Sequence, residues 1–503
     1  MFAKNPLNIS KVLLINLPEE GQCADFYTPK YAIDDFSVYP PLGLLYVATV
    51  AKEYYPVEVM DVVALRYGIK ETVNEILRRS PTVLGISCTT FRIYPMAEIV
   101  RCVKAQLPNA IVVVGGPHCA LYPVETVNLP GVDYVIVGDG EYSFKKLLDV
   151  ISSGRQEELK NIPGLVFCYD GNIIQNPPDR TMPVDNLVIP DWSMLDYKYY
   201  YTSADQQNEQ TVTMVSSRGC PFRCNFCDVM EKTYRARSAK AVVDEMESII
   251  STFPNPVIHV FDDTFNIIRD RVLQICNEIK RRNLKITWTT RARAHPFDEE
   301  MIVAMKEVGL KRIHFGVESG SDITLKKIKK GITKRQIENA FVLCNKYNID
   351  VLAYFIIGFN WETKKDINDT ISFIKKIRPT FIMANTLYPA ARTEIYTDLL
   401  KSRKIKQDFW REFTANPTPN FILPKWQNRA TRNYLKRKLD EIYLRFYLSP
   451  SFVFRNVKSD TKAGFSFAAL FFKVKLAFLL TKSYLANLLI EKINLGSEEN
   501  EIR

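Results

Sequence analysis

The sequence Ser217-Arg218-Gly219-Cys220-Pro221-Phe222-Arg223-Cys224-Asn225-Phe226-Cys227 carries three cysteines at C-x3-C-x2-C spacing. It directly follows an apolar, strand-like run from Val212 to Val215. The other seven of the ten cysteines are scattered, and several lie in apolar runs, where cysteine packs as a small hydrophobic residue. The clustered cysteines are therefore the candidates for a metal centre.

The number of thiols in this loop limits the kind of metal centre. Thiolates are soft ligands that suit zinc or iron–sulfur clusters. A structural zinc site needs four ligands, and no second pair of cysteines accompanies this loop. A standard [4Fe–4S] cluster takes four cysteines, so three would leave one iron open to bind another molecule. The spacing favours a reactive cluster, with a zinc knuckle in a non-enzymatic scaffold as the alternative.

Residues 9–150 alternate apolar runs with helical stretches. Near-continuous apolar strands between amphipathic helices predict a doubly wound α/β sheet that is parallel and covered on both faces. Ligands bind such sheets at the carboxyl ends of the strands. The expected strands are Val12 to Ile15, Val57 to Val62, Val83 to Ser87, Ile111 to Val114 and Val132 to Val137.

Small and polar residues follow three of these strands, at Ser87 to Thr90, Gly115 to His118 and Gly138 to Glu141. Any one of these glycines is explained by a tight turn. Together they offer places where a backbone can approach a bulky ligand closely. We expect a lone histidine such as His118 to lie at the surface or behind the residues that contact a ligand.

Residues 151–211 are predicted to connect two domains. Asp170-Gly171 stands between two short apolar runs and is a strong signal for a two-residue hairpin. Several prolines follow, which indicates an extended linker.

Residues 212–395 again alternate strand and helix signals. Six strand–helix units are two short of an eight-fold barrel, so the pattern predicts a partial (β/α)6 barrel with its active site at the carboxyl ends of the strands. The expected strands are Val212 to Val215, Val257 to Phe261, Ile286 to Thr289, Arg312 to Gly316, Val351 to Ile357 and Phe381 to Asn385.

The cysteine spacing, with aromatic Phe226 just before the last cysteine, resembles the signature of the radical SAM superfamily. The resemblance implies that Cys220, Cys224 and Cys227 each hold one iron of a [4Fe–4S] cluster. The fourth iron would then chelate S-adenosylmethionine (SAM), and an electron from the cluster would cleave it to a 5′-deoxyadenosyl radical.

The same resemblance suggests further residues for SAM. Asp262 and Asp263 lie in a D-D-T-F segment that resembles one in many cobalamin-type radical SAM enzymes, which makes them candidates to bind the methionyl amine; an aspartate there can equally cap the next helix. The G-x-E-S-G segment makes Glu318 and Ser319 candidates for polar contacts. Phe226 and Gly358 complete the expected SAM-binding set.

The first domain resembles the cobalamin-binding domain that precedes many radical SAM cores. The motifs are Tyr39 to Leu44, Val114 to His118 and Val137 to Glu141. Where some relatives carry a D-x-H-x-x-G motif with an axial histidine, this chain reads Asn16 to Gly21 and keeps only the glycine. The resemblance implies cobalamin held without a histidine from this loop; loss of cobalamin binding is the alternative. The expected contacts are Ser87, Thr89, Gly115, Gly116, Gly138 and Gly140.

Residues 396–503 are basic and predicted to be helical. Within 465–490 an apolar stretch is broken by Lys473, Lys475 and Lys482, which disfavours a membrane-spanning helix. A helix lying in a membrane interface and a helical cap on the open barrel are both consistent with it. The net charge of +11 therefore has an explanation without nucleic acid. The start of the sequence shows no secretory signal, so we expect the cytoplasm, with membrane association left open.

The resemblance as a whole covers class B methylases, the anaerobic cyclases of chlorophyll synthesis and the hopanoid methylases. It implies cobalamin-dependent methylation of an unactivated carbon in a hydrophobic small molecule. An external electron donor such as flavodoxin or ferredoxin would reduce the cluster. Oxidative cyclisation or rearrangement linked to cobalamin is the alternative chemistry.

Overall fold

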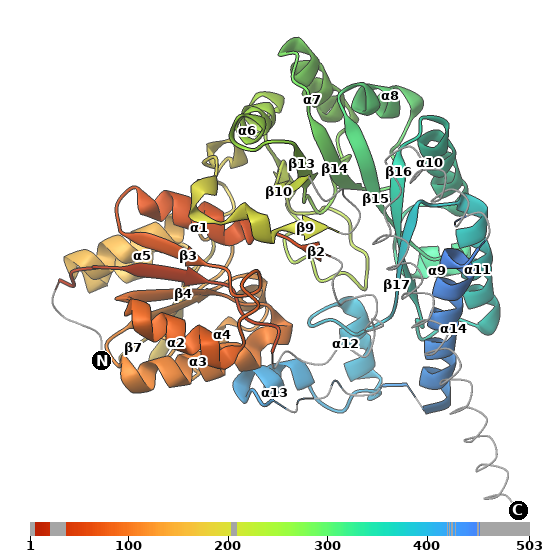
Figure 1. Cartoon of the computed structure of the whole chain (residues 1–503). Helices are drawn as coiled ribbons and strands as arrows, with labels where there is room; N and C mark the ends of the chain where they lie inside the picture. Colours follow the sequence, from red (N-terminus) through yellow and green to blue (C-terminus); the bar gives the residue numbers. More distant parts are fainter. Residues whose placement is uncertain are drawn as a thin grey trace, which may run out of the picture.

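A computed structural model describes residues 6–20, 37–202, 209–419, 421, 423, 426–427, 429–449 and 452. These residues form two α/β bodies, each built around its own sheet, with the C-terminal helices beside both (Figure 1). The apolar stretch expected at 465–490 lies outside the described residues.

The first sheet confirms the predicted doubly wound fold. Its strand order is β3-β1-β4-β5-β6-β7-β8, and the first five strands are parallel. The order reverses beside β1, and ligands bind such sheets at the reversal point. The strands are β1 (Val12–Ile15), β3 (Val57–Met60), β4 (Val83–Ser87), β5 (Ile111–Gly115), β6 (Tyr134–Ile136), β7 (Leu165–Tyr169) and β8 (Asn172–Gln175). The helices are α1 (Leu42–Lys52), α2 (Ile69–Arg79), α3 (Ile93–Gln106), α4 (Pro123–Val127) and α5 (Glu141–Ser153).

The predicted hairpin is present and belongs to this sheet. β7 and β8 pair antiparallel around Asp170-Gly171, and β7 pairs antiparallel with β6. Both turn residues have positive φ, as a two-residue hairpin turn requires. The first sheet thus extends into residues that the sequence alone placed in a connector.

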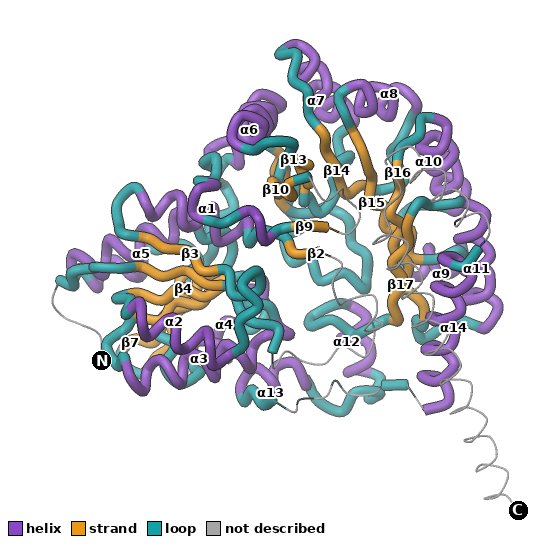
Figure 2. The backbone as a smooth tube through the Cα atoms, in the orientation of Figure 1, coloured by secondary structure: helices purple, strands orange, loops and turns teal. Residues whose placement is uncertain are grey.

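The second sheet has six parallel strands in sequence order and forms the expected partial barrel (Figure 2). They are β10 (Gln210–Met214), β13 (Pro256–Val260), β14 (Thr287–Ala292), β15 (Leu310–Glu318), β16 (Asp350–Ile357) and β17 (Phe381–Thr386). The helices are α6 (Ala239–Thr252), α7 (Arg269–Arg281), α8 (Glu299–Glu307), α9 (Asp322–Lys327), α10 (Lys334–Lys346) and α11 (Lys364–Ile377). Two short ladders complete the pairing: β2 (Ser37–Val38) with β9 (Tyr201–Thr202), and β11 (Ser217–Arg218) with β12 (Arg235–Ala236).

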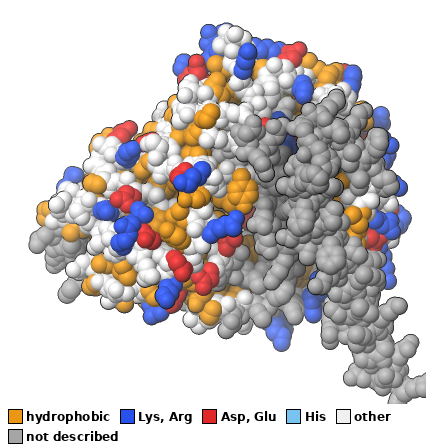
Figure 3. Space-filling view, in the orientation of Figure 1, with side chains coloured by type: hydrophobic (Ala, Val, Ile, Leu, Met, Phe, Trp, Pro, Cys, Tyr) orange, Lys and Arg blue, Asp and Glu red, His pale blue; other side chains and the backbone are white. Residues whose placement is uncertain are grey.

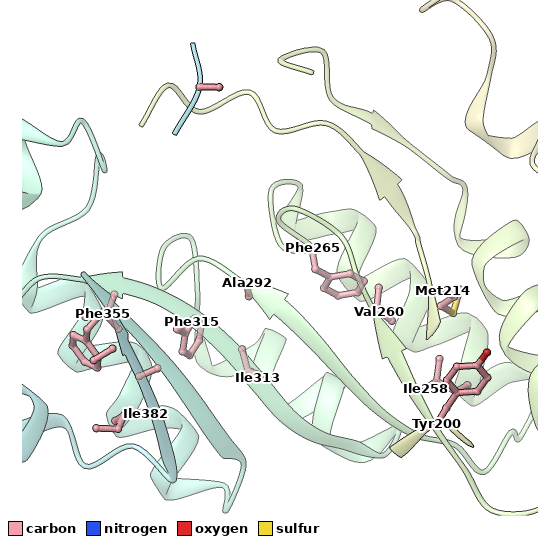
Figure 4. Close-up of a cluster of buried hydrophobic side chains, with 14 of the residues drawn as sticks. Tyr200, Met214, Ile258, Val260, Phe265, Ala292, Ile313, Phe315, Phe355 and Ile382 are labelled. Carbon is pink, nitrogen blue, oxygen red and sulfur yellow. The ribbon is translucent and has the colours of Figure 1, made fainter. Parts of the chain in front are cut away.

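Alternate residues of the second sheet's strands face the helices and form a continuous apolar core. Met214, Ile258, Ile313 and Phe355 are examples, each at most 1% exposed (Figure 4). The intervening residues face the opposite side of the sheet, because side chains alternate along a strand. The helices α10 and α11 begin with capping boxes at Thr333 and Thr363.

The C-terminal region contacts both bodies. After α12 (Glu394–Lys401), helix α13 (Phe409–Ala415) packs against α4, and Arg411 pairs with Glu125 of that helix. Helix α14 (Arg429–Tyr447) lies along β17 at the open edge of the barrel. Within the described residues, α14 covers this edge of the barrel; the two roles expected for 465–490 concern residues outside the described part of the chain.

Two tyrosines of α14 complete the hydrogen bonding of β17. The Tyr443 hydroxyl accepts from the backbone nitrogen of Ala384 and donates to its carbonyl, both at 3.0 Å. Tyr447 bonds to the nitrogen and carbonyl of Ile382 in the same way. An unpaired edge strand invites pairing with another chain, and these hydroxyls occupy its free groups.

On the face drawn in Figure 3, basic, acidic and apolar side chains are interspersed over the first body rather than gathered by sign. Among the described helices, none is both long and apolar enough to span a bilayer.

Replacing Tyr443 or Tyr447 by Phe should destabilise the barrel edge by about 1–3 kcal/mol each, because a buried backbone group loses its partner. Hydrogen exchange of peptides that cover 381–386 should accelerate, and the thermal midpoint should fall. Tyr199→Phe removes an exposed hydroxyl and serves as the control. Unchanged exchange at 381–386 in the double variant would contradict the capping role.

Candidate active site

The chain enters and leaves the segment that carries the cysteines through two paired strands, Ser217–Arg218 and Arg235–Ala236, which we call the neck. The ladder of β11 and β12 closes the loop at its base, with Arg218 opposite Arg235. Gly219 has φ of +79°, and a side chain there would meet the carbonyl of Thr233. The Cys220 nitrogen donates to the carbonyl of Glu231 at 3.0 Å. The glycine before the first cysteine is thus required by a sharp turn.

Contacts with the barrel hold the rest of the loop. The Arg293 guanidinium stacks on the Phe222 ring at 3.7 Å from its centre. The Asn225 side chain donates to the carbonyl of Lys327 at 2.9 Å. Phe226 packs edge-on against Phe359, which follows β16. The loop is therefore fixed before any ligand binds.

All three cysteines of the loop are half-buried, and the Cys220 sulfur lies 3.7 Å from the Thr264 hydroxyl. Burial raises the pKa of Cys227 to about 11, so a positive metal centre is needed to keep this thiolate charged. Within the described part of the chain, no group of three His, Cys, Asp or Glu side chains lies close enough to hold a single metal ion. The loop offers three thiols, which is the number that a cluster with one open iron uses, whereas a structural zinc site takes four ligands.

Asp262 organises the turn that leads into the cysteine loop. It is fully buried, and its carboxylate accepts hydrogen bonds from the backbone nitrogens and the hydroxyls of Ser216 and Ser217. These four bonds use the acceptor sites of a carboxylate. Asp262 therefore holds the loop, whereas the neighbouring Asp263 is exposed and lines a cavity.

The other residues expected around SAM have different surroundings. Glu318 forms a buried ion pair with Lys330 at 2.7 Å. Ser319 is fully buried, and its hydroxyl lies 3.2 Å from that of Thr370 in α11. A side chain at Gly358 would meet Leu435 of α14, so the cap helix already occupies the space beside this glycine.

A cavity of about 240 Å³ lies at the carboxyl end of the first sheet, where the strand order reverses. Five of the six residues expected to bind cobalamin line it, and Thr89 does not. We call it the glycine cavity; those five are Ser87, Gly115, Gly116, Gly138 and Gly140.

His118 does not line the glycine cavity and is fully buried, so of its two expected positions it takes the one behind the lining residues and not the one at the surface. Its ring nitrogen Nδ1 lies 3.1 Å from the Thr90 hydroxyl. Burial lowers its pKa to about 4, which keeps the imidazole neutral.

A second cavity of about 270 Å³ lies between the two bodies and includes Gly219, Phe261 and Asp263 in its lining. We call it the interdomain cavity. It shares Gly138, Asp139 and Arg218 with the glycine cavity, so the two adjoin. The structure thus places the start of the cysteine loop, Ser217 to Gly219, beside the cavity that five of the six predicted cobalamin contacts line.

Comparison with known proteins identifies the architecture. The family model of the radical SAM superfamily matches residues 214–374, and that of the B12 binding domain matches residues 33–148. An uncharacterized methyltransferase of Pyrococcus horikoshii is 32% identical over 424 residues, which cover 83% of this chain and 90% of that protein. The chain belongs to the radical SAM superfamily. It is an enzyme of the branch that carries a B12-binding domain before the radical SAM core.

More distant relatives agree with this assignment. The anaerobic magnesium-protoporphyrin IX monomethyl ester cyclase of Rubrivivax gelatinosus is 25% identical over 428 residues, 82% of this chain and 75% of the cyclase. The structure of the radical SAM methyltransferase TsrM from Kitasatospora setae, solved with cobalamin and a [4Fe–4S] cluster, has a TM-score of 0.62 at 20% identity. That match covers 78% of this chain and 75% of TsrM, and it shows the same fold.

The concave face of this radical SAM barrel carries polar residues that the sequence analysis did not single out. Thr213, His259, Thr289 and Arg312 stand in register across four strands, each at most 2% exposed. The His259 ring bonds to the Thr289 hydroxyl at 2.9 Å. Alternation along each strand could have revealed them, because they occupy positions between the core residues.

Asp262→Asn should weaken the attachment of the cysteine loop, since the amide presents a donor where the carboxylate accepted. We expect a stability loss of about 1–3 kcal/mol and less iron bound after anaerobic reconstitution. Asp263→Asn is the matched control and should bind iron as the wild type does. Equal iron content in the two variants would contradict the positioning role of Asp262.

Proposed function

We propose that the protein is a cobalamin-dependent radical SAM methyltransferase that acts on an unactivated carbon of a small molecule. The observation that carries this proposal is the junction of the two cavities beside the cysteine loop. The methyltransferase of Pyrococcus horikoshii, the relative of 32% identity, supports the same chemistry. When bound, the cluster would supply the electron that cleaves SAM, and cobalamin would supply the methyl group.

In this proposal the three loop cysteines hold the cluster. The support is the chemistry of the donor set: three half-buried thiols on a loop that the barrel already fixes. Asp263 would bind the methionyl amine of SAM, because its carboxylate faces the interdomain cavity while that of Asp262 is fully engaged. Phe226 would pack beside the bound SAM, and the paired Glu318 and Lys330 would form a polar wall.

Cobalamin would occupy the glycine cavity with part of the molecule. Gly116 and Gly138 have positive φ, and a side chain at Gly116 would meet the backbone of Cys88 at 2.8 Å. A side chain at Gly115 would instead enter open space, with its nearest neighbour at 4.0 Å. The absence of a side chain at Gly115 therefore leaves open space beside the backbone, and a large ligand needs such space to approach the backbone closely. No histidine occurs from Asn16 to Gly21, so we propose that this loop leaves the lower face of cobalt without an imidazole.

The substrate and the reductant are finer parts of the proposal. We expect a hydrophobic small molecule, because Val215, Met230 and Phe261 contribute apolar surface to the interdomain cavity. An external one-electron donor such as flavodoxin or ferredoxin would reduce the cluster. We place the enzyme in the cytoplasm; contact with a membrane would involve residues 465–490, outside the described part of the chain.

Anaerobically reconstituted and reduced protein should convert SAM to 5′-deoxyadenosine, and the triple variant with alanine at Cys220, Cys224 and Cys227 should not. With SAM labelled in its methyl group, label should transfer to protein-bound cobalamin even without substrate. Cleavage of SAM without any transfer of label to cobalamin would favour the cyclisation or rearrangement chemistry over methylation.

Gly115→Val should abolish cobalamin binding with little effect on stability, because the added side chain enters the cavity and not the surrounding protein. Absorption spectra during a hydroxocobalamin titration measure the first effect, and the thermal midpoint measures the second. Iron uptake by this variant should match that of the wild type. Tight cobalamin binding by Gly115→Val would remove the glycine cavity from the proposal.

Asp263→Asn should weaken SAM binding about tenfold, as expected when a hydrogen bond to a charged group is lost. Isothermal titration of the reconstituted protein measures the dissociation constant. Asp179→Asn is the control, because Asp179 lines the same cavity and its carboxylate accepts hydrogen bonds from Thr181 and Met182 in its own turn.

A further inference from the structure

The carboxylate of Asp139, in the first domain, forms ion pairs with both strands of the neck. Oδ1 of Asp139 lies 2.8 Å from the Arg218 guanidinium, and Oδ2 lies 2.7 Å from that of Arg235. The two arginines are cross-strand partners in the ladder of β11 and β12. Like charges directly opposite each other destabilise a strand pair. Asp139 therefore neutralises a repulsion that would otherwise open the neck.

A second contact fixes the same arginine. Arg218 also pairs with Glu141, the first residue of α5, and its guanidinium lies 5.7 Å from the centre of the Tyr46 ring. The side chains of Arg218, Arg235, Asp139 and Glu141 are 17%, 12%, 22% and 4% exposed. Two cations and two anions balance in this mostly buried group. Removing one member leaves an uncompensated charge in a poorly solvated place.

The position of Asp139 gives this group a role beyond stability. Asp139 stands between Gly138 and Gly140, and all three residues line the glycine cavity. A ligand in that cavity would restrict the loop that carries Asp139. Arg218 in turn is only two residues before Cys220 along the chain. The side chain of Asp139 thus connects the 138–141 loop to the cysteine loop, so the mobility of one loop should depend on that of the other.

We propose that Asp139 is a positioning residue that couples the glycine cavity to the cysteine loop. A ligand that orders the 138–141 loop closes the neck, and a closed neck in turn favours binding of that ligand, because coupling between two sites is reciprocal. The identity of the ligand as cobalamin rests on the proposed function above. The bridge that Asp139 makes between Arg218 and Arg235, which we call the clamp, rests on the contacts of Asp139 alone.

The first experiment tests the clamp without any cofactor. Hydrogen exchange of the full-length, cluster-free chain should be roughly tenfold faster in Asp139→Asn than in the wild type, in peptides covering 217–236, as expected when one partner of a buried ion pair is lost. Peptides covering 350–377 report whether the barrel remains folded and should not change. Asp179→Asn removes a charge from the adjoining cavity without touching the neck, and it should behave as the wild type. Asp139→Glu keeps the charge and should restore most of the protection.

Equal exchange in Asp139→Asn and the wild type would overturn the clamp. A loss of protection in Asp179→Asn as large as that in Asp139→Asn would also overturn it, since the effect would then come from the charge of the cavity and not from the bridge.

The second experiment tests the coupling with hydroxocobalamin as the probe. In the wild type, saturating hydroxocobalamin should slow exchange in the 217–236 peptides, and in Asp139→Asn it should not. Asp139→Asn should also bind hydroxocobalamin about tenfold more weakly, by the same reciprocity. Binding to the wild type without any change at 217–236 would overturn the coupling. A wild type that binds no hydroxocobalamin would instead contradict the proposed function, and the exchange data on the cofactor-free chain would still stand.

Discussion

The carboxylate of Asp262 is the interaction on which the active site depends. It gathers the two backbone nitrogens and two hydroxyls of Ser216 and Ser217 at the point where the first barrel strand ends. Because it lies at the end of the next strand, it ties the start of the cysteine loop to the barrel itself. A buried carboxylate is costly unless its acceptor sites are used, and here all are used. The direction in which the loop leaves the sheet is therefore set by the interior of the fold.

Buried charged groups also determine how the two bodies are oriented relative to each other. The barrel presents the neck arginines Arg218 and Arg235, and the first domain presents Asp139 and Glu141 from the loop that lines its cavity. A second buried connection runs from Tyr46 to Glu245, which pairs with Arg237 beside the neck. Charged groups that are only partly solvated tolerate few alternative arrangements, so these contacts specify one orientation of the domains. The chemistry proposed here needs such an orientation, because a methyl donor and a radical source must face the same substrate.

Much of this fold is predictable from the sequence, since its strands are short apolar runs that alternate with amphipathic helices. The run from Val12 to Ile15 is a strand with those bounds, and the hairpin follows from Asp170-Gly171. The clustering of the three cysteines is also evident from their spacing, and five of the six residues expected to contact cobalamin line one cavity. The pairing of Arg218 with Glu141 joins residues 77 apart, and no local pattern predicts which distant charge a given arginine meets. The sequence also does not show that Asp262 holds the turn while Asp263 lines the cavity, because that depends on which of two adjacent carboxylates turns inward.

The central claim is that three thiolates hold a cluster whose remaining iron is free to bind SAM. Electron paramagnetic resonance of the anaerobically reconstituted, dithionite-reduced protein tests it most directly. The account predicts the signal of a reduced [4Fe–4S] cluster, and a clear change in that signal when SAM is added, because SAM binds to the open iron. A cluster signal that SAM leaves unchanged, or a protein that takes up zinc and forms no cluster, would contradict the account.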